Sequence, residues 1–121
     1  MKIKNIFDKI KGKEIIIIGD SMVDSYVLGK INRNSPEAPV PIVDIQKEEV
    51  KLGGAANVAL NIQSLGMKPI LCSVIGEDED GKNFLEICKS NNLDTSGILV
   101  DSERKTTNKK RIIVDKKHIL K

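Results

Sequence analysis

Apolar side chains recur along the chain with two different periods, and these periods predict an alternation of helices and strands. Residues 3–10 carry isoleucine and phenylalanine at helical spacing with lysines between them, and Gly12 ends the run, which predicts a short amphipathic helix. Residues 14–18 follow with four consecutive isoleucines. Because β-branched residues without alternation are typical of parallel sheets, this run predicts a strand that is buried on both faces.

The next stretch predicts a small β excursion in place of the helical crossover that usually follows a buried strand. Residues 24–29 alternate weakly, as a strand does, and residues 32–36 predict a turn-rich break. Three prolines between residues 36 and 41 remove backbone donors and favour an extended chain. A strand at 42–45 follows, and the prolines beside it predict that it lies at the edge of a sheet.

The clearest helix begins at Gly53 and Gly54, has a broad apolar face as far as Leu65, and is followed by Gly66 as a suitable C′ residue. This order of elements predicts an α/β fold with a parallel sheet. Since a strand begun at residue 119 has no room to continue, we expect either an incomplete part of a fold or a last strand completed by a partner. The remaining predicted elements are a buried strand at 69–75, a turn at 76–81, a helix carrying residues 84–88, a strand at 97–100, a strand at 107–114, a hairpin turn at 115–118 and the start of a strand at 119–121.

Composition narrows the class to a globular protein of about one domain. The chain has 121 residues, of which 40% are hydrophobic and 31% charged, and only 2% are aromatic. So few aromatic side chains argue against a nucleic-acid surface built on base stacking. The net charge of +3 is uneven, because residues 103–121 carry eight basic and two acidic side chains. A basic tail without a recognised motif gives little support to nucleic-acid binding.

The cysteines and the apolar runs point to the cytoplasm. No apolar run approaches the roughly 20 residues that span a bilayer, and no signal-peptide core follows the basic N-terminus. We therefore expect neither a membrane partner nor a secreted protein. Cys72 and Cys88 lie in apolar segments without metal-ligand spacing, which predicts buried free thiols in a reducing compartment. With His118 as the single histidine, a multi-histidine metal site is excluded.

Two clusters of small and polar residues are candidates for ligand binding. Gly53 and Gly54 precede a helix, where a ligand can approach the backbone and meet free N–H groups, and Asn57 lies in the first turn. This arrangement suits a polyhydroxy or anionic ligand, although a tight turn that lets the helix pack closely explains the same residues. The spacing fits neither a Walker A loop nor a dinucleotide-binding fingerprint. Asp20 and Asp24 follow the first buried strand, where ligands bind in open α/β sheets.

These clusters resemble the N-terminal signature of the ribokinase/phosphofructokinase-B family of sugar kinases. The signature comprises residues 53–59, Gly66 and Gly76 at fixed spacing, together with the strand that ends in Gly19-Asp20. A narrower likeness lies in residues 33–41, which resemble a segment of the heptose 7-phosphate kinases of bacterial lipopolysaccharide core synthesis. Residues 106–111, with two threonines, Lys109 and Arg111, continue that likeness.

The resemblance implies a ribokinase-like α/β fold, with a mostly parallel sheet flanked by helices and a small β lid at about 24–50. In relatives the lid closes over the sugar and forms the contact of a homodimer, so we expect a homodimer through the lid in the complete enzyme. The resemblance implies a sugar-phosphate substrate and places four residues in the sugar site, namely Asp24, Gly53, Gly54 and Asn57.

Charge adds three basic candidates to this site. Lys109 and Arg111 are placed to meet the 7-phosphate of a heptose, and Arg33 to help the lid over an anionic sugar; a solvated basic strand explains the first two equally. For the acidic run at 77–80 a solvated turn is favoured over a metal site, and we expect no metal ligands. Residues 115–121 depart from the family, because relatives tend to have Gln-Gln before a Leu-Leu-Arg run.

The catalytic part of the family pattern is missing from this sequence. The family's catalytic Asp lies in a Gly-Ala-Gly-Asp motif, and the chain contains no such motif. We therefore expect residues 1–121 to be the N-terminal portion of a kinase domain, with the catalytic base beyond Lys121. The complete enzyme would use ATP and Mg²⁺, whereas no cofactor is expected on this portion. Another ribokinase-family sugar or nucleoside kinase, and a non-catalytic sugar-phosphate-binding or dimerising module, remain alternatives.

Overall fold

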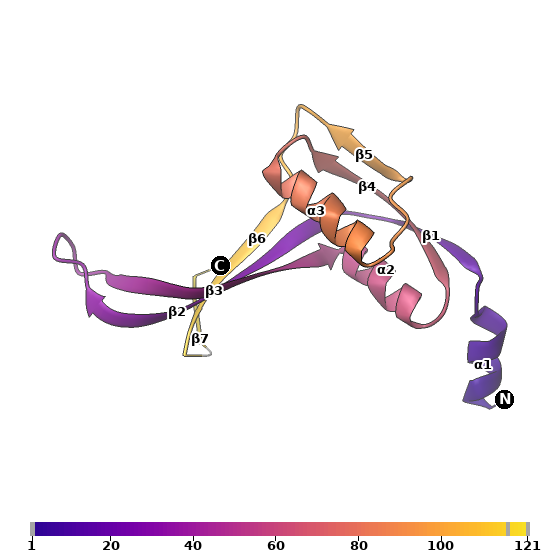
Figure 1. Cartoon of the computed structure of the whole chain (residues 1–121), viewed down its shortest axis with the longest axis horizontal. Helices are drawn as coiled ribbons and strands as arrows, with labels where there is room; N and C mark the ends of the chain where they lie inside the picture. Colours follow the sequence, from indigo (N-terminus) through magenta and orange to yellow (C-terminus); the bar gives the residue numbers. More distant parts are fainter. Residues whose placement is uncertain (1, 116, 121) are drawn as a thin grey trace. The chain divides into compact units, whose positions relative to one another are not determined.

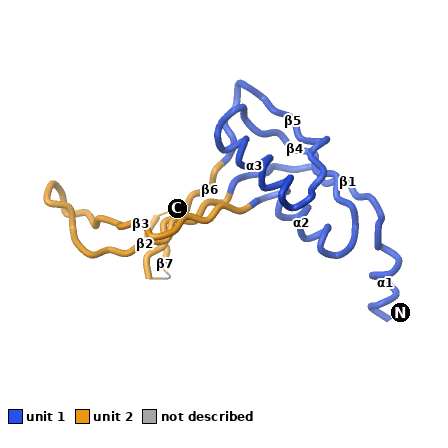
Figure 2. Tube along the Cα trace, viewed as in Figure 1, with its two compact units in different colours: residues 1–23, 52–107 blue, residues 24–51, 108–121 orange. Residues whose placement is uncertain are grey.

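The chain folds as two compact units (Figure 2). The computed structural model describes residues 2–115 and 117–120. Unit 1 comprises residues 1–23 and 52–107, and unit 2 comprises residues 24–51 and 108–121. No helix among the described residues is long and apolar enough to cross a membrane.

Unit 1 is built on a parallel three-stranded sheet in the order β1-β4-β5 (Figure 1). Its register pairs Ile18 with Cys72 and Val74 with Leu99. The predicted parallel sheet is therefore confirmed. The elements of unit 1 are α1 (Ile3–Ile10), β1 (Glu14–Ile18), α2 (Ala55–Ser64), β4 (Lys68–Gly76), α3 (Glu79–Ser90) and β5 (Ile98–Asp101).

The core of unit 1 lies between the sheet and the helices α2 and α3, which cover the same face (Figure 1). Alternate residues of β4 point into this core, so that Leu71 and Ile75 are each only 1% exposed. The helices contribute Ala56, Ala59, Phe84 and Cys88, all of them fully buried. Cys72 and Cys88 are both free thiols. The predicted burial is confirmed for Cys88 but wrong for Cys72, which is only half-buried because it lies next to Leu71 and on the other face of β4.

The opposite face of this sheet is open, which corrects the prediction that residues 14–18 are buried on both faces. Ile17 packs against the core, whereas Ile16 is 63% exposed and Ile18 is 83% exposed. The side chains of a strand alternate between faces, and no described helix covers the second face. The isoleucine run indicates a parallel strand correctly, but the burial of each face depends on what packs against it.

Helix α3 begins earlier than the sequence predicts. The predicted turn at 76–81 ends at Asp78, and the helix begins at Glu79. The Asp78 carboxylate accepts hydrogen bonds from the backbone N–H of Gly81 and of Thr106, both at 2.8 Å. The Thr106 hydroxyl in turn accepts the N–H of Gly76 at 2.8 Å. These three bonds join the end of β4, the start of α3 and the segment that leads to β6.

Unit 2 contains most of a second sheet, in the order β3-β2-β6-β7. The loop 35–40 joins β2 to β3 and is closed by the Ser35 N–H, which donates to the Val40 carbonyl at 2.8 Å. Strands β6 and β7 form an antiparallel hairpin. The predicted hairpin turn at 115–118 includes Lys116, and the predicted last strand includes Lys121; these two residues lie outside the described residues. The strands are β2 (Ser21–Asn34), β3 (Pro41–Gly54), β6 (Asn108–Val114) and β7 (Lys117–Leu120).

Both β2 and β3 are far longer than the predicted strands at 24–29 and 42–45. The predicted break at 32–36 is wrong for residues 32–34, which continue β2. Strand pairing supplies the reason, because the partner strand satisfies the backbone groups of a polar segment that has little strand pattern of its own. The prediction that residues 42–45 lie in an edge strand is confirmed.

Candidate functional site

In unit 1, the beginning of α2 is a backbone site that requires glycine. Gly54 has φ +61°, and a Cβ atom on it would collide with the carbonyl oxygen of Asp20. The same carbonyl accepts the N–H of Ala55 at 2.8 Å, which fixes the start of the helix against the residue that follows β1. Only glycine combines this conformation with so close an approach.

The first turn of α2 offers unused hydrogen-bond donors. Gly54 is the N-cap residue and supplies no side-chain cap. The Ala55 N–H is engaged with Asp20, whereas the N–H groups that follow it in the first turn keep their capacity to bind a ligand. Asn57 lies in this turn with its side chain exposed, whereas Gly53 is buried. The structure therefore brings Gly53, Gly54 and Asn57 together, at the end of β1.

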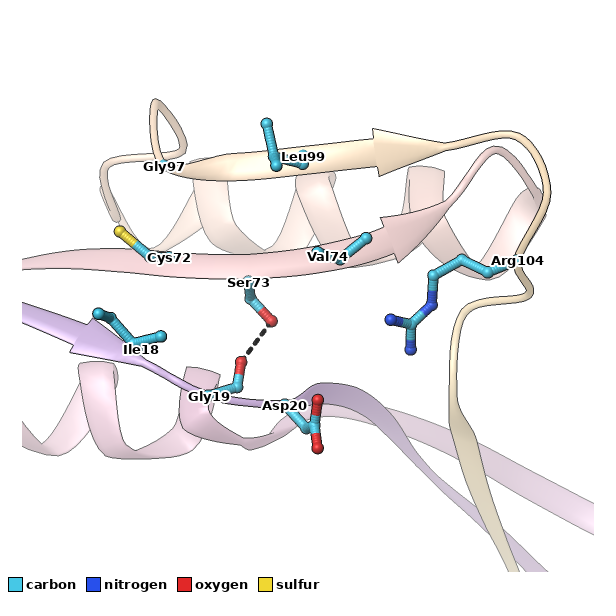
Figure 3. Close-up of a pocket in the computed structure, with 9 residues that line it drawn as sticks. All are labelled: Ile18, Gly19, Asp20, Cys72, Ser73, Val74, Gly97, Leu99 and Arg104. Atoms are coloured by element: carbon cyan, nitrogen blue, oxygen red, sulfur yellow. Dashed lines mark hydrogen bonds between the residues drawn. The ribbon is translucent and has the colours of Figure 1, made fainter.

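A pocket of about 350 Å³ lies beside this helix start, at the carboxyl ends of β1 and β4 (Figure 3). The Ser73 hydroxyl donates to the Gly19 carbonyl at 2.8 Å and joins the two strands there. The side chains of Asp20 and Arg104 lie on the same side of the pocket (Figure 3). The other lining residues are mostly apolar and lie on the open face of the sheet: Ile18, Cys72, Val74, Gly97 and Leu99.

In unit 2, two of the predicted site residues bind each other. The Arg111 guanidinium donates to the Asp24 carboxylate at 2.6 Å, and the two side chains are only 12% and 20% exposed. The guanidinium carbon of Arg111 also lies 5.0 Å from the centre of the Tyr26 ring, and the Lys51 ammonium lies 5.3 Å from the same centre.

The other basic candidates are placed differently. Lys109 lies on β6 two residues before Arg111, hence on the same face of the strand, and is half-buried. Arg33 is exposed and lies nine residues beyond Asp24 on the same strand. At about 3.3 Å per residue this spacing corresponds to about 30 Å. The structure therefore does not bring Arg33 to Asp24.

Sequence reasoning missed the contributions of Tyr26, Thr106 and Asp78. The position of Tyr26, two residues after Asp24, puts it on the same strand face and is a signal that could have found it. Thr106 was noted only as part of a likeness, and nothing local in the sequence reveals its bond to Gly76. Asp78 carried a usable signal, since an aspartate before two acidic residues and a helical apolar run is typical of an N-cap.

Among the described residues, hydrogen bonds or burial shift the pKa values of Glu49, Asp78, Asp94 and Cys88. The backbone N–H of Thr106, followed by its side chain and the Gly81 N–H, lowers the pKa of Asp78. Lys47 lowers the pKa of Glu49, and Ser96 lowers that of Asp94. The interactions that lower these three pKa values stabilise the turns and strands in which they lie. Burial raises the pKa of the Cys88 thiol to about 11, so this cysteine is an unreactive core residue.

The acidic side chains of the described residues are not grouped as metal ligands are. Within residues 2–115 and 117–120, no group of three or more His, Cys, Asp or Glu side chains is placed to hold a metal. In the acidic run at 77–80, Asp78 is engaged with backbone N–H groups of its own unit.

The fold defines the chain as an α/β protein with a pocket at the carboxyl ends of two parallel strands, which is where open α/β sheets commonly bind ligands. The profile of the pfkB family carbohydrate kinases matches residues 13–120. The chain belongs to this family, and its predicted ribokinase-like α/β fold is confirmed by solved structures. It resembles the archaeal nucleoside kinase of Methanocaldococcus jannaschii, a ribokinase-family member, with a TM-score of 0.65 and 22% identity over 90% of this chain and 36% of that one.

Curated relatives are much more similar in sequence. The chain is 52% identical over 109 residues to the bifunctional protein HldE of Helicobacter pylori strain P12, covering 90% of the chain and 24% of the relative. It is 40% identical over 119 residues to HldE of Pelobacter propionicus, covering 98% and 24%. The chain thus spans about a quarter of the length of these two curated relatives.

Among solved structures, the fructokinase of Halothermothrix orenii is also similar, with a TM-score of 0.59 and 29% identity over 83% of this chain and 33% of that one.

Proposed function

We propose that the chain is the N-terminal part of a cytoplasmic kinase domain for D-glycero-β-D-manno-heptose 7-phosphate. The domain would transfer the γ-phosphoryl group of ATP to the anomeric hydroxyl of the sugar, a step toward ADP-heptose for lipopolysaccharide. The observation that carries this proposal is the 52% identity to an HldE protein, together with the segment 33–41 that resembles heptose kinases.

Within each unit taken by itself, the residues selected from the sequence are proposed as contacts to a sugar phosphate. From unit 1, the first turn of α2 with Gly53, Gly54 and Asn57 would present N–H and amide groups to sugar hydroxyls. From unit 2, Asp24 would accept hydrogen bonds from hydroxyls, and Lys109 would meet the phosphate. Residues 24–50 would form the lid. Arg33, about 30 Å along β2 from Asp24, is left outside the site.

The chemistry itself is proposed to need residues that this sequence lacks. ATP, when bound, supplies the phosphoryl group, and a general base must take the proton of the acceptor hydroxyl. The sequence contains no Gly-Ala-Gly-Asp motif to supply that base. What the described residues can do is bind and orient the sugar. We therefore expect no turnover from residues 1–121 alone.

An ADP-release assay on the whole gene product tests the substrate. The expected result is a far higher kcat/KM for the heptose 7-phosphate than for heptose, fructose, ribose or adenosine. Preference for fructose or a nucleoside would instead support another ribokinase-family kinase, an alternative favoured by the fructokinase likeness. Residues 1–121 form the second arm of the assay, in which ATP-dependent product would contradict the proposed inactivity.

Dimerisation through unit 2 is the proposed assembly of the complete enzyme. Both edge strands of its sheet expose large apolar side chains, Ile45 and Val50 on β3 and Ile119 and Leu120 on β7. Exposed edges of this kind readily pair with another chain. Light scattering of the purified protein should give the mass of a dimer, and a charged residue at Ile45 should shift it toward monomer. A monomer at all concentrations would refute this assembly.

A further inference from the structure

We propose that Arg111 is a positioning residue that holds the Asp24 carboxylate for the sugar, and that it does not bind the phosphate of the substrate. This inference rests on the proposed sugar-kinase function and assigns a role within the same site. It replaces the expectation that the charge of Arg111, like that of Lys109, serves the phosphate.

The first support is the geometry of the ion pair. The nitrogen Nη1 of Arg111 lies 2.6 Å from the oxygen Oδ1 of Asp24, which is at the short end for a charge-assisted hydrogen bond. The two residues are 87 positions apart, so the contact is created by the fold and not by local sequence. Both side chains are largely shielded from water, and in such surroundings an ion pair is stronger than on an open surface.

The second support is the aromatic ring beneath the guanidinium. Arg111 lies 5.0 Å from the centre of the Tyr26 ring, within the range of a cation–π contact. Planar stacking and a carboxylate partner together restrict the orientation of an arginine far more than either contact alone. Arg111 therefore has two contacts, one with Asp24 and one with Tyr26, and together they restrict the orientation of its guanidinium group.

The third support is charge. The guanidinium charge is already compensated by Asp24, and a phosphate that captured Arg111 would leave a carboxylate without its partner beside a new anion. The bond to Arg111 is made to Oδ1, and an ionised carboxylate has about four lone-pair sites on its two oxygens. Asp24 can thus keep Arg111 and still accept a hydroxyl hydrogen.

Kinetics of the whole gene product on heptose 7-phosphate and on unphosphorylated heptose separate the two roles. The variants are Arg111→Met, Arg111→Lys, Asp24→Asn and the double variant Asp24→Asn/Arg111→Met. Lys110→Met is the matched control, because Lys110 is exposed on the opposite face of β6. Lys109→Met serves as the comparison for a phosphate contact. Thermal unfolding of each variant verifies that it is folded.

We expect Arg111→Met to raise KM about tenfold for both sugars, leaving their ratio unchanged, since one charge-assisted contact corresponds to about a factor of ten. Arg111→Lys should recover part of this loss. The double variant should be no worse than Asp24→Asn alone, because Arg111 acts through Asp24. Lys109→Met should weaken only the phosphorylated sugar, and Lys110→Met should change KM less than twofold.

Three results would overturn the inference: a KM loss in Arg111→Met confined to the phosphorylated sugar, additive losses in the double variant, or an unchanged KM in Arg111→Met. If Arg111→Met does not fold, Arg111→Lys with Asp24→Asn completes the same cycle. A wild-type protein that phosphorylates neither heptose refutes the proposed function instead. The cycle is then measured with the sugar that the protein does phosphorylate, where additivity still refutes the positioning role.

Discussion

Thr106 is a sensitive point in unit 1 because its hydroxyl is buried and accepts a backbone N–H. Its side chain is only 6% exposed, and its Oγ1 accepts the Gly76 N–H at 2.8 Å. Valine has nearly the same shape as threonine but cannot accept this bond. The change Thr106→Val therefore leaves a buried N–H without a partner while keeping the backbone bond from Thr106 to Asp78.

The magnitude follows from the burial of the orphaned group. Leaving a buried donor unsatisfied costs about 1–3 kcal/mol, and we take about 2 kcal/mol for this single N–H. For a chain of this size, 1 kcal/mol lowers the melting temperature by about 3–5 °C. Thr106→Val should therefore lower the free energy of unfolding by about 2 kcal/mol and the Tm by about 6–10 °C.

Urea and thermal unfolding followed by circular dichroism measure both quantities. The adjacent Thr107 is exposed and provides the matched control, because its bond to the Val23 N–H is made by the backbone carbonyl, which the substitution keeps. Thr107→Val should stay within about 0.5 kcal/mol of the original chain. Thr106→Ser keeps the hydroxyl and loses one methyl group, so it should cost only about 1 kcal/mol.

A free energy of unfolding for Thr106→Val within 0.5 kcal/mol of the unchanged chain would refute the reasoning. So would equal losses in Thr106→Val and Thr107→Val, because they would trace the effect to the loss of any hydroxyl in this segment and not to the buried bond. Equal losses in Thr106→Val and Thr106→Ser would trace it to packing.

Three further outcomes are expected. Gly54→Ala, with its Cβ forced against a backbone carbonyl at φ +61°, should destabilise the chain by about 2 kcal/mol or more in urea. The N–H of Thr106 keeps the folded pKa of Asp78 below its ordinary 3.8. The carboxylate therefore stabilises the fold above pH 3.8, and this stabilisation is lost as pH falls through the lower folded pKa. The stability difference between the original chain and Asp78→Asn should shrink below about pH 4 in urea titrations. Thiol labelling at pH 8 should modify Cys72 before Cys88, whose pKa burial raises to about 11, and Cys88 should react only on unfolding.

Local sequence patterns predicted the elements that are held together by local rules. The apolar period predicted the helix after Gly53–Gly54 and the strand at 69–75. Glycine's ability to adopt a positive φ explains Gly66, which has φ +92° after that helix. The burial of residues 14–18 was not predictable in the same way. A run of isoleucines specifies a strand, but its exposed face depends on elements elsewhere in the chain.

The contacts of the candidate site were predictable only in part. Asp24 was selected by its position after a strand and by resemblance, and Arg111 by resemblance and charge. Their 2.6 Å contact, however, joins residues 87 positions apart. No periodicity encodes such a pair. The length of β2 was hidden for a related reason, since polar residues near its end are stabilised by cross-strand contacts such as the 3.0 Å bond from Asn32 to Asp44.

The basic tail also acquires a different meaning once strand alternation is considered. In β6 the side chains of Lys109 and Arg111 share one half-buried face, whereas Lys110 is exposed on the other. Arg111 is paired with Asp24, so its charge is compensated within its own unit. A surface that binds nucleic acid by charge needs accessible, uncompensated cations in a row. Strand β6 instead divides its cations between two faces and uses one of them to orient a carboxylate, which is an arrangement suited to a small polar ligand.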